Sequence, residues 1–590
     1  MDHLATAAFI GHGSDASDER DGRAPKRQRT AVACEPCRLR KRRCDGAVPC
    51  KNCGELKIEC VYHKPSAYTN GAQSKSDRIL GKVNRIESLL LSLHKDSPNV
   101  MERDGDTSED NEDGHRKLHL MAADIPASHT SATEQMMSWK IFDQYVSVRN
   151  SFECIFQIEN ARAQFDLTPT NQISYISDEE ANKSKYSFSG SFNFWYPVVE
   201  HVQLEQCCQI AVNHRSSPSC EKCLGLLALA LGSAARQNES KTLVEVNEFG
   251  NMAAYLFKSA YQMIHLSVLV NSSESLLCLF LTAIYFLYVQ RPLQAWHFIN
   301  QAAMKFQLMW AYTASDCNLT QIEILKRVFW SCYSVESDIV AELNEIPQSG
   351  LSNSEALVQL PDRLESHSSS EVSQDSTLYF LACISLRRLL NRTHKLLYAK
   401  ARIETRFSTL VNVATELEHQ LNQWRELLPP QLQFPLDLTA APNEQSGFLR
   451  QRYFTCRAVI FRPFLQQALV SGTVDTPEQL QMCKSCLESC CLHVGNLRRY
   501  RQTVLVDSWI CALSMTGTMM LLLASLDLEQ TRGLTPTYAK NFGHNLISFF
   551  TQCHNPVTDQ SPTVQQCIST IGLIDESMKA RSYGVKDPMF

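Results

Sequence analysis

The sequence predicts a mostly α-helical protein that contains a small six-cysteine cluster with short helices, a short coiled coil and a large all-α domain. Six cysteines recur at regular spacing between residues 34 and 60, and a heptad pattern of apolar residues runs from 79 to 93. From about residue 136 onward, apolar residues follow a helical period with little strand alternation. Because 590 residues exceed what one hydrophobic core usually serves, at least two folded units joined by linkers are expected.

Composition limits where a specialised function can lie. With 44% hydrophobic and 20% charged residues and a net charge of -5, the chain is not a uniformly basic nucleic-acid coat, so any basic function is local. The 23 cysteines would suggest disulfides in a secreted protein, but the N-terminus lacks the features of a secretory signal. We therefore expect a reducing compartment. The uncharged run 508–526 contains several Ser and Thr residues, which favours a buried helix and no membrane partner.

Residues 1–29 are expected to form a disordered tail with a basic end, because they show no hydrophobic periodicity. Between residues 23 and 43 the sequence has nine Lys or Arg residues and one acid, Glu35. The local basic region that the net charge conceals therefore lies here.

The cysteines of residues 30–64 predict a closed metal cluster. They form two copies of Cys-x2-Cys-x6-Cys, namely Cys34, Cys37, Cys44, Cys50, Cys53 and Cys60. Three thiolates cannot complete a tetrahedron, but if Cys34 and Cys50 bridge both ions, each of two zinc ions receives four sulfur ligands. Such filled sites are structural and leave no position for a catalytic water.

The two intervals between cysteines differ in charge. The first interval contains five cations, Arg38, Arg40, Lys41, Arg42 and Arg43, whereas residues 54–59 show no cationic excess. Cations attract phosphates, and long donors reach guanine edges in the major groove, so this interval predicts contacts with double-stranded DNA. An alternative is that some of these cations only neutralise the formal charge of about -2 on two zinc ions with six thiolates.

Residues 65–78 read as a polar linker, and residues 79–94 read as a coiled-coil helix. The heptad positions, spaced four, three, four and three, are Ile79, Val83, Ile86, Leu90 and Leu93. This pattern predicts a homodimer. A single amphipathic helix that packs on its own chain stays an alternative, because the repeat is short and contains Gly81.

The remaining chain divides into an acidic linker and a helical region. Seven acids lie in residues 101–115 with almost no apolar residue, so residues 95–135 are expected to be a disordered linker. Residues 136–590 are expected to form the all-α domain, with helix breaks at Pro292, at residues 347–350 and at residues 429–430.

Residues 33–60 resemble the fungal binuclear zinc cluster transcription factors. They carry all six cysteines, the basic first interval, Asp45 and Gly46 after the third cysteine, and Pro49 in the connecting loop. The resemblance implies a nuclear, sequence-specific regulator of RNA polymerase II genes that places a short helix in the major groove. It also implies that Arg40 and Lys41 touch the bases of CGG-type triplets, while the other cations hold phosphates.

The large helical region resembles, more weakly, the fungal-specific regulatory domain of that family. The similarity lies in residues 194–199 (FWYPVV), 294–311 and 328–351. Residues 344–347 depart from the family pattern. They read Asn-Glu-Ile-Pro, whereas the family often has a Gly-Arg-Pro type of turn at this place. The resemblance implies that a co-regulator or a small-molecule effector acts on this domain.

Two further cysteine groups are open to two interpretations. Cys220 with Cys223, and the group Cys483, Cys486, Cys490 and Cys491, are either redox or metal sites or simply small buried hydrophobic residues, and the second is favoured. The usual enzyme motifs are missing, so a non-enzymatic protein is expected. The alternative to a DNA-binding regulator is a nuclear, zinc-dependent protein-interaction scaffold.

Overall fold

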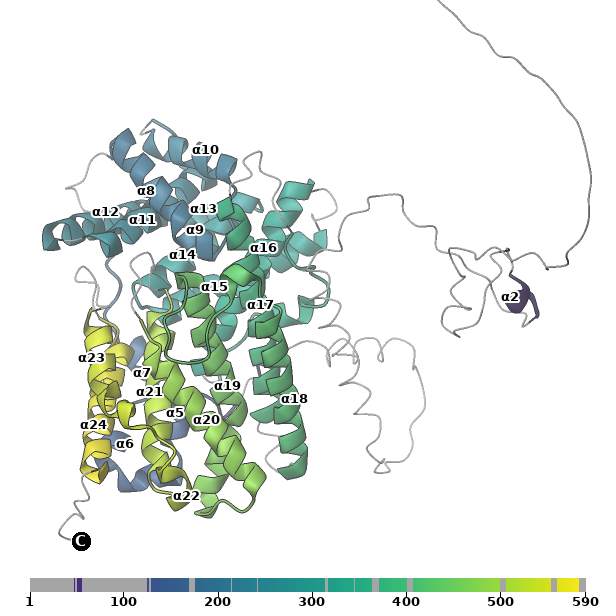
Figure 1. Ribbon diagram of the computed structural model, residues 1–590. Helices are drawn as coiled ribbons and strands as arrows, with labels where there is room; N and C mark the ends of the chain where they lie inside the picture. The colour runs from purple at the N-terminus through teal and green to yellow at the C-terminus, as the bar shows by residue number, and fades with distance from the viewer. Residues whose placement is uncertain are drawn as a thin grey trace, which may run out of the picture. The chain divides into compact units, whose positions relative to one another are not determined.

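The computed structural model describes residues 47, 50–55, 125–126, 129–168, 176–213, 215–240, 242–312, 317–343, 345–362, 371–399, 407–498, 506–552 and 560–582 (Figure 1). The chain separates into two compact units, residues 1–97 and 98–590. Of the first unit, the described part is residue 47 and the short helix α2 (Lys51–Glu55) with Cys50 before it. The predicted tail, the linker at residues 65–78 and the coiled coil lie outside the described residues, and of the predicted linker at residues 95–135 only 125–126 and 129–135 are described.

The second unit is built of helices, which confirms the predicted fold class. Its first part consists of α5 (Thr133–Met137), η1 (Lys140–Gln144), α6 (Val146–Asn150), α7 (Ile155–Asn160), α8 (Asp178–Gly190), α9 (Phe192–Trp195), α10 (His201–Val212), α11 (Cys220–Glu239), α12 (Leu243–Tyr261), α13 (Ile264–Leu269), α14 (Ser273–Tyr288), α15 (Pro292–Tyr312) and α16 (Leu319–Glu342).

Its second part consists of η3 (Leu351–Ser354), α17 (Glu371–Leu397), α18 (Phe407–Glu426), η5 (Pro430–Leu432), α19 (Glu444–Ser471), α20 (Pro477–Gly495), α21 (Ser508–Ser525), α22 (Glu529–Arg532), η6 (Thr537–Asn541), α23 (Phe542–Gln552) and α24 (Pro562–Ser582). Within the described ranges, extended pairing is limited to one isolated bridge, between His129 and Ala399.

The helix ends follow the breaks that the sequence predicts. Pro292 is the first residue of α15 and Pro430 is the first residue of η5, positions where the missing N–H of proline costs nothing. After α16 the chain turns through Gly350, whose φ of 77° is the left-handed conformation that glycine adopts readily. At the start of α16, Asn318 and Gln321 form a reciprocal capping box.

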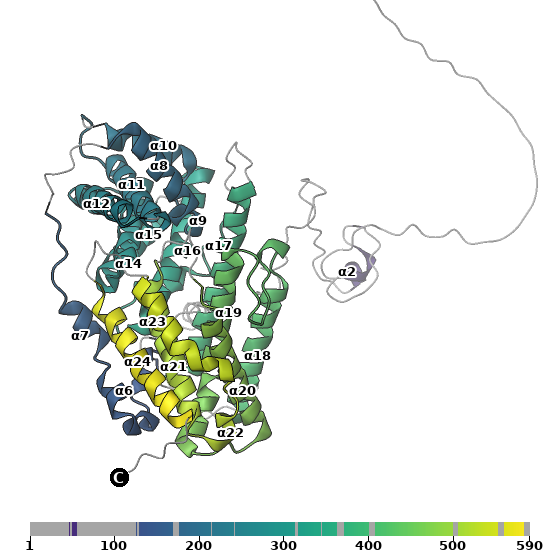
Figure 2. The ribbon, with the colours of Figure 1, turned by 60° about the vertical axis from the view of Figure 1, so that its left-hand side comes forward.

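Helix α11 lies at the centre of the first part, where it contacts α8, α10, α12 and α14 (Figure 2). Two glycines permit this close packing. A Cβ on Gly225 would collide with the backbone carbonyl of Cys207 on α10, and a Cβ on Gly232 would collide with that of Ser184 on α8. The small residues of α11 therefore bring its neighbours to backbone contact distance.

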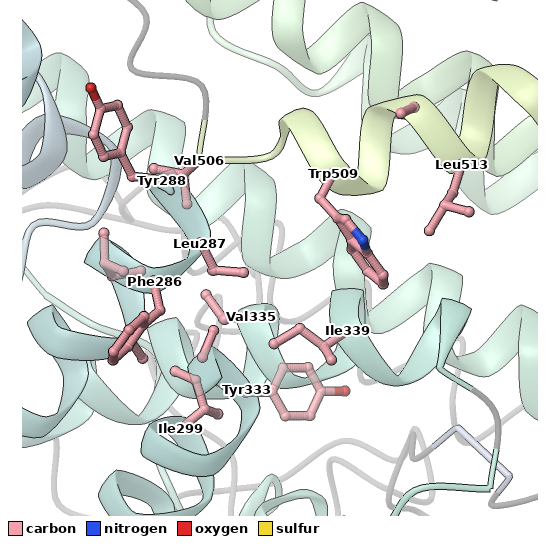
Figure 3. Packing of buried hydrophobic residues seen from close by; sticks show 14 of the residues in the cluster. Phe286, Leu287, Tyr288, Ile299, Tyr333, Val335, Ile339, Val506, Trp509 and Leu513 are labelled. Carbon is pink, nitrogen blue, oxygen red and sulfur yellow. The ribbon is translucent and has the colours of Figure 1, made fainter. Parts of the chain in front are cut away.

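The second part is a bundle of longer helices, in which α19 packs on α17, α18 and α20, and α21 packs on α24 (Figure 2). One hydrophobic core extends through both parts, from Met136 to Met578. Figure 3 shows where they meet: Tyr333 and Ile339 on α16 lie near Leu287 on α14 and Trp509 on α21.

Helix α21 is the buried helix that the sequence predicts for the uncharged run. It is long and apolar enough to cross a membrane by length and composition, but 83% of its residues are buried inside the protein. Its Gly517 faces Thr133 of α5, and Thr133 donates a hydrogen bond from its hydroxyl to the carbonyl of Leu513 (3.1 Å).

The predicted boundary between linker and helical domain, after residue 135, is wrong. His129 is fully buried, and its Nε2 lies 3.0 Å from the carbonyl oxygen of Val340 at the end of α16. The hydroxyl of Ser131 lies 2.7 Å from Nδ1 of His129 and 2.8 Å from Nδ1 of His394. Residues 129–135 therefore belong to the helical unit, because distant helices supply their partners.

Candidate metal centre

Cys50 and Cys53 are the two predicted zinc ligands that the structure describes. Cys50 directly precedes α2, and its carbonyl accepts a hydrogen bond from the N–H of Gly54 (2.9 Å), which closes the first helical turn. Residues three apart share one face of a helix, and both cysteines are buried, with 0% and 1% exposure. Two buried cysteines on one helical turn fit the donor set of a zinc–thiolate cluster.

The other predicted site residues lie outside the described residues. These are the metal ligands Cys34, Cys37, Cys44 and Cys60, the DNA-contacting cations between residues 38 and 43, and the coiled-coil positions from 79 to 93. In the described part of the chain, no three or more His, Cys, Asp or Glu side chains are grouped as metal ligands.

The second cysteine groups behave as buried thiols. Cys220 and Cys223 are at most 6% exposed, and the thiol of Cys223 donates to the carbonyl of Ala260 (3.4 Å). Burial raises the pKa of the thiols of Cys483 and Cys491 on α20 to about 12. Because the thiolate is the form that reacts and binds metal, these observations favour the interpretation as small buried hydrophobic residues.

The turn after α16 is held by side chains from two helices. The indole N–H of Trp296 donates to the carbonyl of Pro347 (3.1 Å), and the carboxylate of Glu336 accepts from the hydroxyl of Ser349 (2.7 Å). Glu345 adopts a left-handed φ of 67° in this turn. The described part of this segment, residues 345–350, therefore forms a hydrogen-bonded turn.

One group of polar residues was not singled out from the sequence. Arg387, Arg452 and Arg462 lie inside the second unit and line one cavity together with His394 and His493. These five residues come from three helices, α17, α19 and α20, so no spacing along the chain marked them as a group.

Comparison with known families gives two matches to this chain. A family model described as the fungal Zn(2)-Cys(6) binuclear cluster domain matches residues 32–69. A second model, described as the fungal specific transcription factor domain, matches residues 186–426. The two matched segments contain, respectively, the predicted cysteine cluster and most of the first helical part together with α17 and α18.

Related proteins have names that point to transcription factors and not to enzymes. The putative transcription factor ecdB of Aspergillus rugulosus is 24% identical over 542 residues, which cover 86% of this chain and 91% of that protein. The aspyridones cluster regulator apdR of Emericella nidulans is 40% identical over 80 residues, 13% of this chain and 10% of that protein. Transcription factor kojR of Aspergillus flavus is 39% identical over 82 residues, 14% of this chain and 13% of that protein.

Both domain matches, the spacing of the cysteines and the helices in the described part of the second unit agree with one another. The chain therefore resembles the fungal binuclear zinc cluster transcription factors in two segments, the cluster domain at residues 32–69 and the fungal specific transcription factor domain at residues 186–426.

Proposed function

We propose that the protein is a sequence-specific regulator of RNA polymerase II genes that reads CGG-type triplets. The observation that carries this proposal is the pairing of a cluster domain with five cations in its first six-residue interval. In this proposal Arg40 and Lys41 read base edges, and Arg38, Arg42 and Arg43 hold phosphates. Transcription factors act on chromosomal DNA, so we place the protein in the nucleus.

The cluster holds two zinc ions in this proposal. Cys34 and Cys50 bridge the ions, and the remaining ligands are Cys37, Cys44, Cys53 and Cys60. The burial of Cys50 and Cys53 on one helical turn supports their shared role as ligands. When bound, the zinc ions supply no catalysis and hold the basic segment in a fixed shape, since so short a segment has little apolar core.

The protein binds DNA as a homodimer through residues 79–93 in this proposal. The support is the heptad spacing, together with Lys82 and Glu87 at positions where opposite charges pair between parallel helices. Two linked half-sites gain from effective concentration, which makes two triplets far more selective than one.

The test is selection of bound sites from a random DNA pool by the full-length protein at physiological salt. Enrichment of paired CGG-type triplets at a constant spacing supports both base reading and dimerisation. Enrichment of single triplets would reject the dimer, and weak, salt-labile binding without enrichment would favour the scaffold alternative.

A further inference from the structure

A cavity of about 170 Å³ lies within the helical unit. Its walls come from α16, α17, α19, α20 and α21 and from the segment at residues 131–133. A smaller hollow of about 60 Å³ shares four of its lining residues, Asp338, Phe448, Arg452 and Asp507. An apolar cavity of about 150 Å³ accommodates benzene, so this space has room for a compact organic molecule.

Part of the wall is apolar. Leu386 and Leu390 on α17, Val459 on α19, and Ile510 and Met515 on α21 line the main cavity. The smaller hollow adds aromatic side chains, among them Trp195 and Tyr379, whose ring centroids are 4.8 Å apart. These surfaces favour an aromatic or branched aliphatic body.

The polar part of the wall carries three guanidinium groups. Asp338 forms ion pairs with Arg387 and with Arg452 (3.7 Å), and Arg452 also pairs with Asp507 (3.0 Å). Arg462 instead donates to the carbonyl of Ser131 (2.8 Å). Two carboxylates therefore balance two of the three guanidinium groups by direct ion pairs.

Glu342 is the third carboxyl group on the cavity wall, and its charge is weakened by its surroundings. Its carboxylate accepts a hydrogen bond from the backbone N–H of Thr133 (3.0 Å). Burial nevertheless raises its pKa to about 7. At neutral pH a substantial fraction of Glu342 is protonated, which leaves the polar wall with a positive balance.

Several polar atoms on the wall have no hydrogen-bond partner. The Arg387 side chain is 4% exposed, yet its Nε and one terminal nitrogen are unpartnered. His493 is 4% exposed and its Nδ1 is unpartnered, as are both amide atoms of Gln451. Folded proteins rarely leave buried polar atoms unpaired, so such atoms around a cavity indicate a missing partner.

We propose that this cavity binds a small carboxylic acid with an aromatic or branched aliphatic body. The carboxylate accepts hydrogen bonds from the unpartnered donors of Arg387 and Gln451, and its charge offsets the excess of guanidinium groups. The body occupies the apolar part of the wall.

A ligand bound in this cavity would also contact several elements of the helical unit at once. The wall joins α16, α17, α19, α20 and α21 with the segment at residues 131–133, which enters the helical unit from the N-terminal side. A ligand that bridges these elements stabilises the state in which they are assembled. Ligand binding at this cavity is a property separate from DNA recognition. Because it is measured on the protein without DNA, a failure to bind these ligands would not contradict the proposed DNA binding.

The experiment uses calorimetric titration and thermal unfolding of the full-length protein at pH 7. The probes are benzoate, phenylacetate and 4-methylpentanoate, each paired with its uncharged amide. We expect at least one acid to bind and to raise the unfolding midpoint, and its amide to bind about tenfold or more weakly, because the amide lacks the charge that the guanidinium groups recognise.

Three variants locate the binding site. Arg387→Met should abolish binding of the acid. Gln451→Leu should weaken binding of the acid without lowering the unfolding midpoint of the free protein, because it removes polar atoms that have no partner. If Arg387→Met does not fold, Gln451→Leu still tests the proposal. The matched control is Gln552→Leu, at an exposed position on α23.

Two results would overturn the proposal. The first is that none of the acids binds, which would mean that the cavity holds only water. The second is that an acid binds wild type and Gln451→Leu equally, or binds no better than its amide, which would place binding elsewhere or make it non-specific.

Discussion

Replacing Glu342 by glutamine is expected to stabilise the helical unit above pH 7 and to remove a pH dependence. Glu342 lies at the end of α16, where burial raises its pKa from the ordinary 4.5 to about 7. Because the folded state holds the proton more tightly than the unfolded chain, the free energy of unfolding falls as pH rises from about 4.5 to about 7. Glutamine stays neutral and still offers an oxygen to the N–H of Thr133.

The magnitude follows from the pKa difference. One pKa unit corresponds to about 1.36 kcal/mol, so the ionised Glu342 costs up to about 3 kcal/mol at pH 8. Since the side chain is only partly shielded from water, we expect a gain of about 1 to 3 kcal/mol for Glu342→Gln at pH 8, and less than about 1 kcal/mol at pH 5.

The assay is urea unfolding of the full-length protein at pH 5 and pH 8, followed by tryptophan fluorescence. Trp509 on α21 is 1% exposed and reports the core beside this cavity. The matched control is Glu529→Gln, an exposed glutamate on α22. If Glu342→Gln shifts the unfolding free energy equally at both pH values, or lowers it at pH 8, the assignment of a buried, weakly ionised carboxyl group is wrong.

Four further predictions concern the cluster, the dimer and the helical core. Zinc analysis of the full-length protein should find two ions per chain, and chelation should abolish DNA binding while the helical circular dichroism stays nearly unchanged; one ion per chain contradicts the bridged cluster. Lys41→Ala should cost about 1 to 3 kcal/mol on CGG-type DNA and much less on scrambled DNA, whereas Arg43→Ala should weaken binding to both alike and reduce the salt slope by about one; equal losses for Lys41→Ala on both DNAs reject its base-reading role. Deletion of residues 79–93 should leave the cluster folded and convert two-site binding into weak single-site binding, measured by gel shift and sedimentation, and a monomeric wild-type protein would refute this. Gly232→Leu should lower the thermal unfolding midpoint strongly, because its Cβ meets the carbonyl of Ser184, and an unchanged midpoint would refute the close contact of α8 with α11.

The features that the sequence predicted correctly depend on local patterns. The period of the apolar residues predicted helices over the second unit, and Pro292 and Pro430 stand at helix starts because proline lacks an N–H. The uncharged run forms the buried helix α21. Its apolar composition favours burial whichever helices it packs against. The spacing of the cysteines predicted the cluster that the family match to residues 32–69 supports.

What local patterns could not predict depends on partners far apart in the chain. The helical domain begins before the predicted boundary after residue 135 because the hydroxyl of Thr133 donates a hydrogen bond to the carbonyl of Leu513, 380 residues away. The composition of residues 129–135 does not reveal this contact. The domain therefore begins before its helical periodicity does.

The cavity has the same origin. Asp338, Arg387 and Arg452 come from three helices, and each alone reads as an ordinary charged residue. Only the folded structure brings them together, where Asp338 forms ion pairs with Arg387 and Arg452 and two nitrogens of Arg387 have no hydrogen-bond partner. Spacing along the chain determines which residues share a helix face or a metal ion, whereas tertiary packing decides which charged side chains are buried together around one cavity.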